Sequence, residues 1–301
     1  MTDREVRVYE VGPRDGLQNE STPIPTAEKL RYIELLADAG LRTIEATSFV
    51  SPRAVPQLAD ADELMARLER RPGVRYPVLV PNTRGMERAV AAGSDAICVF
   101  TAATDAFTQA NIGMTIAESI DAFRPVVAEA REREWWTRGY VSTAFGCPYT
   151  GEVEASAVVT VARQLIELGV DEISISDTIG VAAPRDVRRV VGALLDDGIG
   201  VDLLAMHFHD TRGTALANVS AALELGIRCF DASTGGTGGC PYAPGAAGNL
   251  ATEDLVYLLD REGMSHAVDL DALLEAARHV SRTLGRSLDT KVGQAGGWRV
   301  P

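Results

Sequence analysis

Leu203-Leu204-Ala205-Met206-His207-Phe208-His209-Asp210 is an apolar run that ends in two histidines. Its length and composition predict a short buried strand, in which alternate side chains point to the same face. His207 and His209 would then leave one face together, as two ligands of a single metal ion must. A pair of histidines satisfied by hydrogen bonds is the alternative. Asp15 and Asn249, which stand in matching contexts near the two ends of the chain, favour the metal site.

The same kind of strand recurs along the chain and alternates with amphipathic stretches such as residues 26–39 and 158–168. The expected strands cover residues 6–11, 43–46, 77–80, 96–101, 139–143, 172–176, 203–208 and 228–232. Eight such units over roughly 250 residues predict an α/β fold, a (β/α)8 TIM barrel. An open doubly wound sheet is the alternative, but no Gly-x-Gly-x-x-Gly follows the first strand. Residues 269–284 predict a closing helix, and we expect one catalytic domain over residues 1–301.

Composition restricts the class of protein further. The 301 residues carry a net charge of −13, which disfavours nucleic acid or an anionic membrane surface as the main partner. No apolar run reaches the ~18 residues of a membrane span, and the polar start lacks a signal pattern. The four cysteines show no Cys-x-x-Cys pairing, which argues against a disulfide framework. We expect a cytoplasmic protein.

In such a barrel, chemically active residues lie where strands end. Asp15 offers an anionic oxygen, His207 and His209 offer neutral nitrogens, and Asn249 offers a carbonyl oxygen. This mixed set suits Mg²⁺, Mn²⁺ or another first-row ion better than a closed structural zinc site. Asp210 should face away from the histidines and support them.

Arg14 stands beside Asp15 and is always protonated, so it can polarise a carbonyl or hold a carboxylate. A salt bridge to Glu45 or Asp177 is the structural alternative. Both interpretations can hold at once, because a carboxylate can orient the guanidinium.

Residues 235–249 contain six glycines and one cysteine, Cys240. This composition, outside any periodic segment, predicts a mobile loop over the active site, following the eighth strand. Cys240 could donate or accept a proton, or it could be a small apolar filler. Phosphate binding by this loop is less favoured, because no Lys-Ser/Thr follows as in a P-loop.

Several long motifs resemble the 3-hydroxy-3-methylglutaryl-CoA lyase family, a group of metal-dependent barrels that also includes the isopropylmalate, citramalate and homocitrate synthases. The resemblance extends over almost the whole chain. The motifs that carry it are Val11-Gly12-Pro13-Arg14-Asp15-Gly16-Leu17-Gln18-Asn19-Glu20, Ser48-Phe49-Val50-Ser51-Pro52, His209-Asp210-Thr211, Gly238-Gly239-Cys240-Pro241-Tyr242-Ala243 and Gly248-Asn249-Leu250-Ala251-Thr252-Glu253.

The resemblance implies retro-Claisen cleavage of a 3-hydroxy-3-methylglutaryl-CoA-like thioester to acetyl-CoA and acetoacetate, with a divalent cation as cofactor and a homodimer as the assembly. It implies a role for each matching residue. The metal ligands are Asp15, His207, His209 and Asn249, the essential arginine is Arg14, and the loop cysteine is Cys240. The supporting carboxylates are Glu45 and Glu253, and Asp177 is a further acidic active-site residue. The base that takes the substrate hydroxyl proton is His207 or Asp15.

The chain departs from the family's pattern at a few positions, with Phe208 between the histidines and Arg212 where a tyrosine is expected. These departures leave open a lyase for a different 3-hydroxy-3-alkylglutaryl-CoA. Two other functions are alternatives. A condensing acyltransferase of the isopropylmalate synthase type would carry a long C-terminal region and lack the Gly-Gly-Cys-Pro-Tyr loop. A catalytically silent barrel would have lost a ligand, Arg14 or Cys240.

Overall fold

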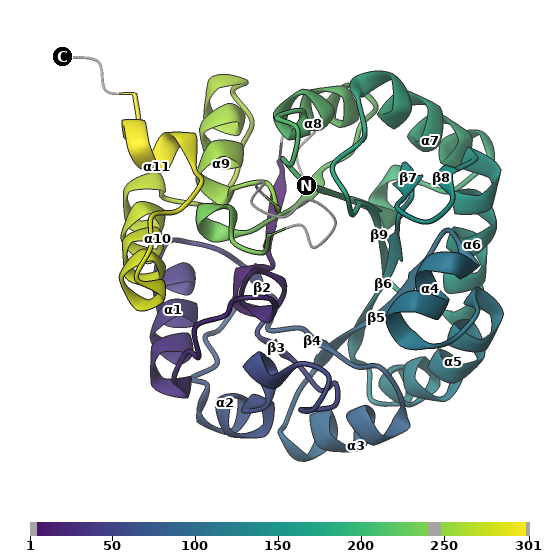
Figure 1. The fold of residues 1–301 in the computed structure, drawn as a ribbon, viewed down its shortest axis with the longest axis horizontal. Coiled ribbons are helices and arrows are strands. Elements are labelled where there is room, and N and C mark those ends of the chain that lie inside the picture. The colour runs from purple at the N-terminus through teal and green to yellow at the C-terminus, as the bar shows by residue number, and fades with distance from the viewer. Residues whose placement is uncertain (1–4, 240–247, 299–301) are drawn as a thin grey trace.

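Parallel strands surrounded by helices form the centre of the computed structural model, which describes residues 5–239 and 248–298 (Figure 1). One sheet contains nine strands in the order β2-β1-β11-β10-β9-β6-β5-β4-β3. Their bounds are β1 Arg7–Glu10, β2 Thr43–Ile44, β3 Thr47–Ser48, β4 Val78–Leu79, β5 Ala96–Ala102, β6 Trp136–Ser142, β9 Glu172–Asp177, β10 Leu204–Phe208 and β11 Cys229–Ala232.

The two ends of this order meet, and their meeting closes the barrel. β2 pairs with β1, and β3 pairs with β4. Between them, the Glu45 amide donates to Glu10 O at 2.8 Å, and the Ala46 amide donates to Pro77 O at 2.9 Å. The predicted strand over residues 43–46 is therefore divided where the chain changes its pairing partner. The predicted (β/α)8 TIM barrel is confirmed.

Helices form a ring outside the strands (Figure 1). Their bounds are α1 Thr26–Asp38, α2 Ala61–Arg67, α3 Thr83–Ala91, α4 Asp105–Ile112, α5 Ile116–Glu132, α6 Ala155–Leu168, α7 Pro184–Asp196, α8 Ala215–Glu224, α9 Thr252–Arg261, α10 Leu270–Leu284 and α11 Lys291–Ala295. The predicted closing helix is α10, which packs against α1 and α9 and so joins the two ends of the ring. A short hairpin of β7 (Gly146–Cys147) and β8 (Gly151–Glu152) follows β6.

The apolar core lies mainly between the strands and the helices, and a smaller cluster fills the inside of the barrel. Several helices end at a glycine. Gly169, for example, ends α6 in the left-handed conformation at φ 94°, which costs glycine less than other residues. Among the described residues, no helix is both long and apolar enough to cross a membrane.

One strand differs from its prediction in a way that matters for the site. The strand expected over residues 139–143 begins earlier, at Trp136, because Trp136, Thr137 and Arg138 pair in parallel with Ala96–Cys98. Arg138 thereby enters the barrel, where its side chain is completely buried.

Candidate active site

The two histidines leave β10 on the inside of the barrel, as the alternation of strand side chains requires. His207 is the fourth residue of β10, and His209 follows its last residue. In the parallel register, His207 lies beside Ser176 of β9 and Asp231 of β11. Both imidazoles are nearly buried, and their ring centroids are 5.2 Å apart.

Asp15 lies in a tight helical turn, Gly12–Gly16, directly after β1. The amides of Asp15 and Gly16 both donate to Val11 O, at 2.7 and 3.2 Å. Glycine is required at both ends of this turn. A Cβ at Gly12 would collide with Glu10 and Tyr32, and a Cβ at Gly16 would lie 2.6 Å from Ser233 Oγ and closer still to Thr237 Oγ1.

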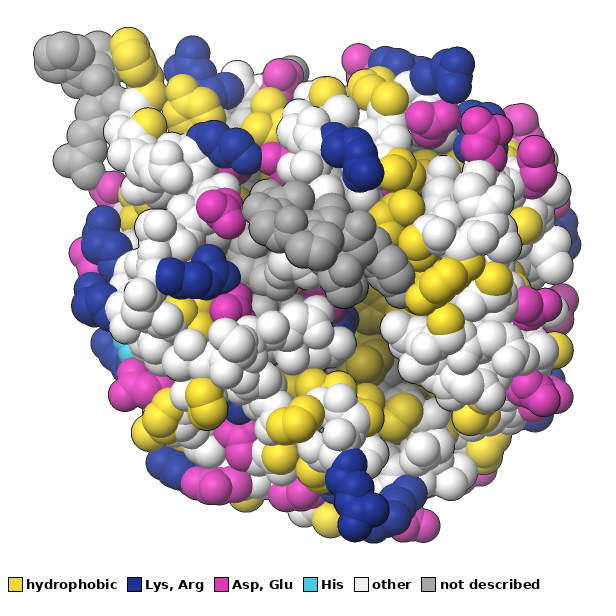
Figure 2. All heavy atoms as spheres, in the orientation of Figure 1, with side chains coloured by type: hydrophobic (Ala, Val, Ile, Leu, Met, Phe, Trp, Pro, Cys, Tyr) yellow, Lys and Arg dark blue, Asp and Glu magenta, His cyan; other side chains and the backbone are white. Residues whose placement is uncertain are grey.

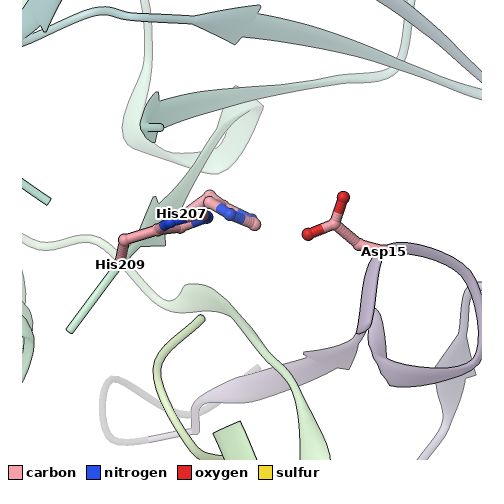
Figure 3. A group of neighbouring side chains, drawn as sticks. All are labelled: Asp15, His207 and His209. Atoms are coloured by element: carbon pink, nitrogen blue, oxygen red, sulfur yellow. The ribbon is translucent and has the colours of Figure 1, made fainter. Parts of the chain in front are cut away.

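The turn after β1 and the end of β10 bring three potential metal ligands together. Asp15, His207 and His209 each offer one ligand atom, and these atoms lie within 4.8 Å of one another. In Figure 3, the Asp15 carboxylate faces the two imidazoles. Asp15 lies near the N-terminus and the two histidines lie far along the chain, and the closure of the barrel places all three at one end of the strands.

Asn249 completes this group. Its Nδ2 donates to Asp15 Oδ2 at 2.8 Å and to Thr237 O at 3.0 Å. Its Oδ1 is buried and accepts no hydrogen bond from the described residues. His209 Nδ1 is also buried and has no hydrogen-bond partner among them. Buried polar atoms without partners are rare in folded proteins. The oxygen and nitrogen donors therefore fit a divalent cation, which would satisfy them.

The charge states in this group suit a cation. Burial alone would raise the pKa of Asp15, but the charge of Arg14, helped by the histidines and Asn249, lowers it to about 2. Burial, with His207 nearby, lowers the pKa of His209 to about 3. An ionised carboxylate and a neutral imidazole are the forms that bind metal ions.

Arg14 is held on two sides by carboxylates, as the sequence predicted for Glu45. Its Nε donates to Glu45 Oε1 at 2.6 Å, and its Nη1 donates to Asp15 Oδ1 at 2.5 Å. Burial opposes the charged form, but Glu45 and Asp15 outweigh it and raise the pKa of Arg14 further. Glu45 Oε2 also accepts hydrogen bonds from Tyr9 (3.1 Å) and Tyr140. The guanidinium is thus oriented by fixed partners.

A cavity of about 480 Å³ opens over these residues, and Figure 2 shows a hollow on this face of the molecule. Arg14, Asp15, His207 and His209 contribute to its polar lining. Its apolar lining includes Leu79, Val80, Phe100, Phe107, Ile112, Met114 and Phe123. The arrangement offers an ionic centre next to a large apolar wall, and a mostly apolar pocket with a few placed polar groups is typical of small-molecule binding sites.

Two predicted acidic residues lie in supporting positions. Asp177 ends β9 and accepts hydrogen bonds from the amides of Val181 and Ala182, each at 3.0 Å. Of the two carboxylates that could form a salt bridge with Arg14, Glu45 is the one that does so. Burial raises the pKa of Asp177 to about 6. Glu253 accepts the Gly235 amide with both oxygens, at 3.0 and 2.9 Å.

The predicted loop over residues 235–249 is described only at its two ends. Thr234–Gly236 form a short helical turn after β11, and Gly238 and Gly239 line the cavity. Cys240 lies outside the described residues. Lys291 Nζ donates to Asp210 Oδ2 at 2.6 Å. The Asp210 side chain therefore points away from the two histidines, as predicted.

Three buried polar residues near the site were missed from the sequence: Glu10, Arg138 and Asp231. Asp231 Oδ2 is 3.2 Å from His207 Nδ1, and Arg138 Nη2 donates to Asp231 Oδ1 at 2.6 Å. Each is a charged residue within or at the end of a strand, and such a charge was the available signal.

Known proteins match almost the whole chain. A family model described as HMGL-like matches residues 5–280. The chain is 47% identical over 292 residues to the mitochondrial hydroxymethylglutaryl-CoA lyase of Gallus gallus, covering 97% of this chain and 98% of that one.

Solved structures resemble the chain to the same degree. A hydroxymethylglutaryl-CoA lyase from Pseudomonas aeruginosa matches with a TM-score of 0.95 and 46% identity, over 97% of each chain. An HMG-CoA lyase from Acinetobacter baumannii, in complex with coenzyme A and 3-methylmalate, matches with a TM-score of 0.94 and 39% identity. That match covers 100% of this chain and 99% of the other.

Proposed function

Because the chain belongs to the HMGL-like family, we propose that it is a metal-dependent lyase that cleaves 3-hydroxy-3-methylglutaryl-CoA into acetyl-CoA and acetoacetate. The observation that carries the proposal is the convergence of Asp15, His207 and His209 beside Arg14 at the floor of a cavity. Near-full-length relatives at 46–47% identity are named as lyases of this substrate.

The reaction breaks the bond between C2 and C3 of the acyl group. The C3 hydroxyl loses its proton and becomes the ketone of acetoacetate. The electron pair of the broken bond moves onto the thioester as an enolate, which then takes up a proton at C2 to become acetyl-CoA. The protein must therefore accept one proton, stabilise a developing oxyanion and donate one proton.

Asp15, His207, His209 and Asn249 would hold the cation, most simply Mg²⁺ or Mn²⁺. The unpartnered Oδ1 of Asn249 supports its inclusion as a ligand. A divalent cation bound there supplies Lewis-acid polarisation of the substrate hydroxyl and of a carboxylate oxygen.

Arg14 stabilises the enolate oxygen. Its guanidinium is permanently charged, lines the cavity and is fixed by Glu45 and Asp15. A donor that is already oriented loses little freedom as charge develops, which is the basis of electrostatic stabilisation in active sites. Glu45 acts by orienting Arg14.

Proton transfer involves both sides of the bond. The two candidate acceptors of the hydroxyl proton are His207 and Asp15. An imidazole whose Nε2 binds the cation and whose Nδ1 carries a proton has no free lone pair, so that state leaves this step to Asp15, which is ionised at neutral pH. Cys240 donates the proton to the enolate carbon, a role that rests on its place in the sequence motif alone. Asp177 and Glu253 support the walls of the site through the backbone amides that they accept.

The substrate is an acyl-CoA. The apolar wall of the cavity supports binding of the apolar parts of this substrate. One catalytic domain, a homodimer and a cytoplasmic location stay predictions. Sedimentation at several protein concentrations and cell fractionation test the assembly and the location.

The test of the proposed reaction is product analysis. Protein loaded with Mg²⁺ or Mn²⁺ is incubated with 3-hydroxy-3-methylglutaryl-CoA, and the proposal expects acetyl-CoA and acetoacetate in equal amounts. Analogues with longer 3-alkyl groups are compared in parallel. Faster cleavage of one of them would assign a different acyl group. Release of free CoA from acetyl-CoA plus a 2-oxo acid, without cleavage of the first substrate, would identify a condensing enzyme and contradict the proposal.

A further inference from the structure

Four charged side chains form a continuous line inside the barrel, which the reaction above does not use. Arg7, at the start of β1, pairs with Glu172, at the start of β9. Glu172 also pairs with Arg138 Nε at 3.1 Å, and Arg138 Nη2 donates to Asp231 Oδ1 at 2.6 Å. The line ends at His207. It therefore runs from the N-terminal ends of the strands to a proposed metal ligand.

Asp231 is the member that contacts the active site. Its Oδ1 accepts from Arg138, and its Oδ2 accepts from Ser174 Oγ at 2.9 Å and lies 3.2 Å from His207 Nδ1. The side chains of Asp231 and Arg138 have no exposed surface. Each oxygen of the carboxylate thus has a defined partner, and neither contacts water.

The charge of Asp231 determines what His207 can do. An ionised carboxylate only accepts hydrogen bonds, so the facing nitrogen of His207 must carry the proton. A neutral imidazole that carries its proton on Nδ1 has its lone pair on Nε2. Metal-binding histidines commonly donate their other nitrogen to a carboxylate in this way.

Arg138 stabilises the ionised form of Asp231. Burying a carboxylate without a partner is very unfavourable, and the guanidinium compensates it. Arg138 is itself held by Glu172 and by the faces of two aromatic rings, with its Cζ 3.9 Å from the centroid of Tyr9 and 5.0 Å from that of Tyr140. Apolar side chains could fill the same space with comparable stability, so the burial of these charges indicates a role beyond packing.

We infer that Asp231, fixed by Arg138 and Ser174, is a positioning residue that keeps the proton of His207 on Nδ1 and directs Nε2 toward the cation. The inference rests on the proposed function only in that His207 serves as a metal ligand.

The first test measures the tautomer of His207 in the metal-free protein. The chain has only four histidines, so ring nitrogens labelled with ¹⁵N give few signals, and the variant His207→Gln identifies those of His207. At pH 8.5, we expect the proton on Nδ1. A proton on Nε2 would overturn the inference. This result needs neither substrate nor metal, so it is independent of the lyase assay.

The second test measures the affinity for Mn²⁺ by electron paramagnetic resonance of the free ion. In Asp231→Asn, the amide can present either a donor or an acceptor to His207, so the tautomer is no longer fixed. We expect affinity to fall about 10- to 100-fold. The matched control is Arg7→Gln, at the partly exposed end of the same line, which should bind Mn²⁺ like the wild type.

Equal affinities in Asp231→Asn and the wild type, or equal losses in Asp231→Asn and Arg7→Gln, would contradict the positioning role. Circular dichroism establishes that each variant is folded before titration. If Asp231→Asn does not fold, the tautomer of the wild-type His207 decides the question alone. A fixed Nδ1 proton together with failure of the cleavage assay would reject the proposed reaction and keep this inference.

Discussion

Arg14 is the residue at which charge, burial and orientation are most closely connected. Its side chain is 9% exposed, and carboxylates from two different strand ends hold it. Because the guanidinium keeps its charge in this environment, it provides a positive group at the cavity floor that does not depend on pH. The same contacts restrict its position to one side of the proposed metal site.

We predict that Arg14→Ala lowers kcat by about 10²- to 10³-fold, the usual loss when one donor to a developing oxyanion is removed. Mn²⁺ binding should be retained, because Arg14 contributes no ligand atom and a bound cation itself favours the ionised form of Asp15. Steady-state kinetics and Mn²⁺ titration measure the two effects separately. Arg14→Lys serves as the control that keeps the charge but loses the paired geometry. A kcat within about tenfold of the wild type, roughly 1.4 kcal/mol in activation free energy, would exclude the proposed role.

Among the elements, the turn Gly12–Gly16 has little space for change. The turn carrying Asp15 packs against the segment that follows β11, and a Cβ added at Gly16 would collide with the hydroxyls of Ser233 and Thr237. The two sides of the metal site are therefore connected through this contact.

We predict that Gly16→Ala displaces the turn and weakens both Mn²⁺ binding and turnover. Gly192→Ala is the matched control, since Gly192 lies within α7 and an added Cβ meets nothing within 4 Å. In a helix, that change should stabilise the protein by about 0.5–1 kcal/mol. Wild-type Mn²⁺ affinity in Gly16→Ala would mean that the turn adapts without moving Asp15.

Two buried carboxylates hold the segment after β11 in place. Glu10 accepts from the amide and hydroxyl of Thr234 and from the hydroxyl of Thr252, at 2.9, 2.8 and 2.7 Å. Glu253 accepts the amide of Gly235. Burial raises the pKa of Glu10 to about 7 and that of Glu253 to about 8.

These pKa values predict how stability depends on pH. Folded Glu253 keeps its proton up to about pH 8, whereas in the unfolded chain it loses the proton near its model value of 4.5. Between these values the unfolded state binds fewer protons, so the free energy of unfolding should fall as pH rises. In Glu253→Gln, which has no proton to lose, this decline should be shallower.

Urea unfolding of the metal-free protein between pH 5 and 8 measures this slope. Glu132→Gln, at an exposed position in α5, is the control and should keep the wild-type slope. If Glu253→Gln keeps it as well, Glu253 is not a neutral buried acid.

At the scale of the whole molecule, closure of the barrel is what assembles the site. Asn249 and Asp15 are hydrogen-bonded although 234 positions separate them. β1 and β11 are neighbours in the sheet, so the first and last strands present their following residues at one edge. A TIM barrel places its active residues at this edge in general.

Much of this arrangement could be predicted from the sequence. Alternation within a strand predicted that His207 and His209 lie on one face. Because residues that follow the strands of a barrel lie at the same end, Asp15 and Asn249 were expected beside them. The number of strand and helix units predicted the barrel. These features are local and periodic, so a single sequence carries them.

The interior ion pairs could not be predicted in this way. Arg138 and Asp231 lie in different strands, and their contact depends on which strands face each other across the barrel. The break in the strand at Glu45 was also missed, because it arises where the sheet closes and not from a breaker residue. Long-range geometry of this kind leaves no local pattern.

The central claim, cleavage of the acyl-CoA at one divalent metal site, is tested most directly by a metal titration. Chelator-stripped protein is mixed with 3-hydroxy-3-methylglutaryl-CoA, and acetyl-CoA release is followed as Mn²⁺ is added. Our account predicts no release without metal and saturation near one ion per chain, with no recovery in His209→Ala. Full turnover by the stripped protein, or by His209→Ala, would contradict it.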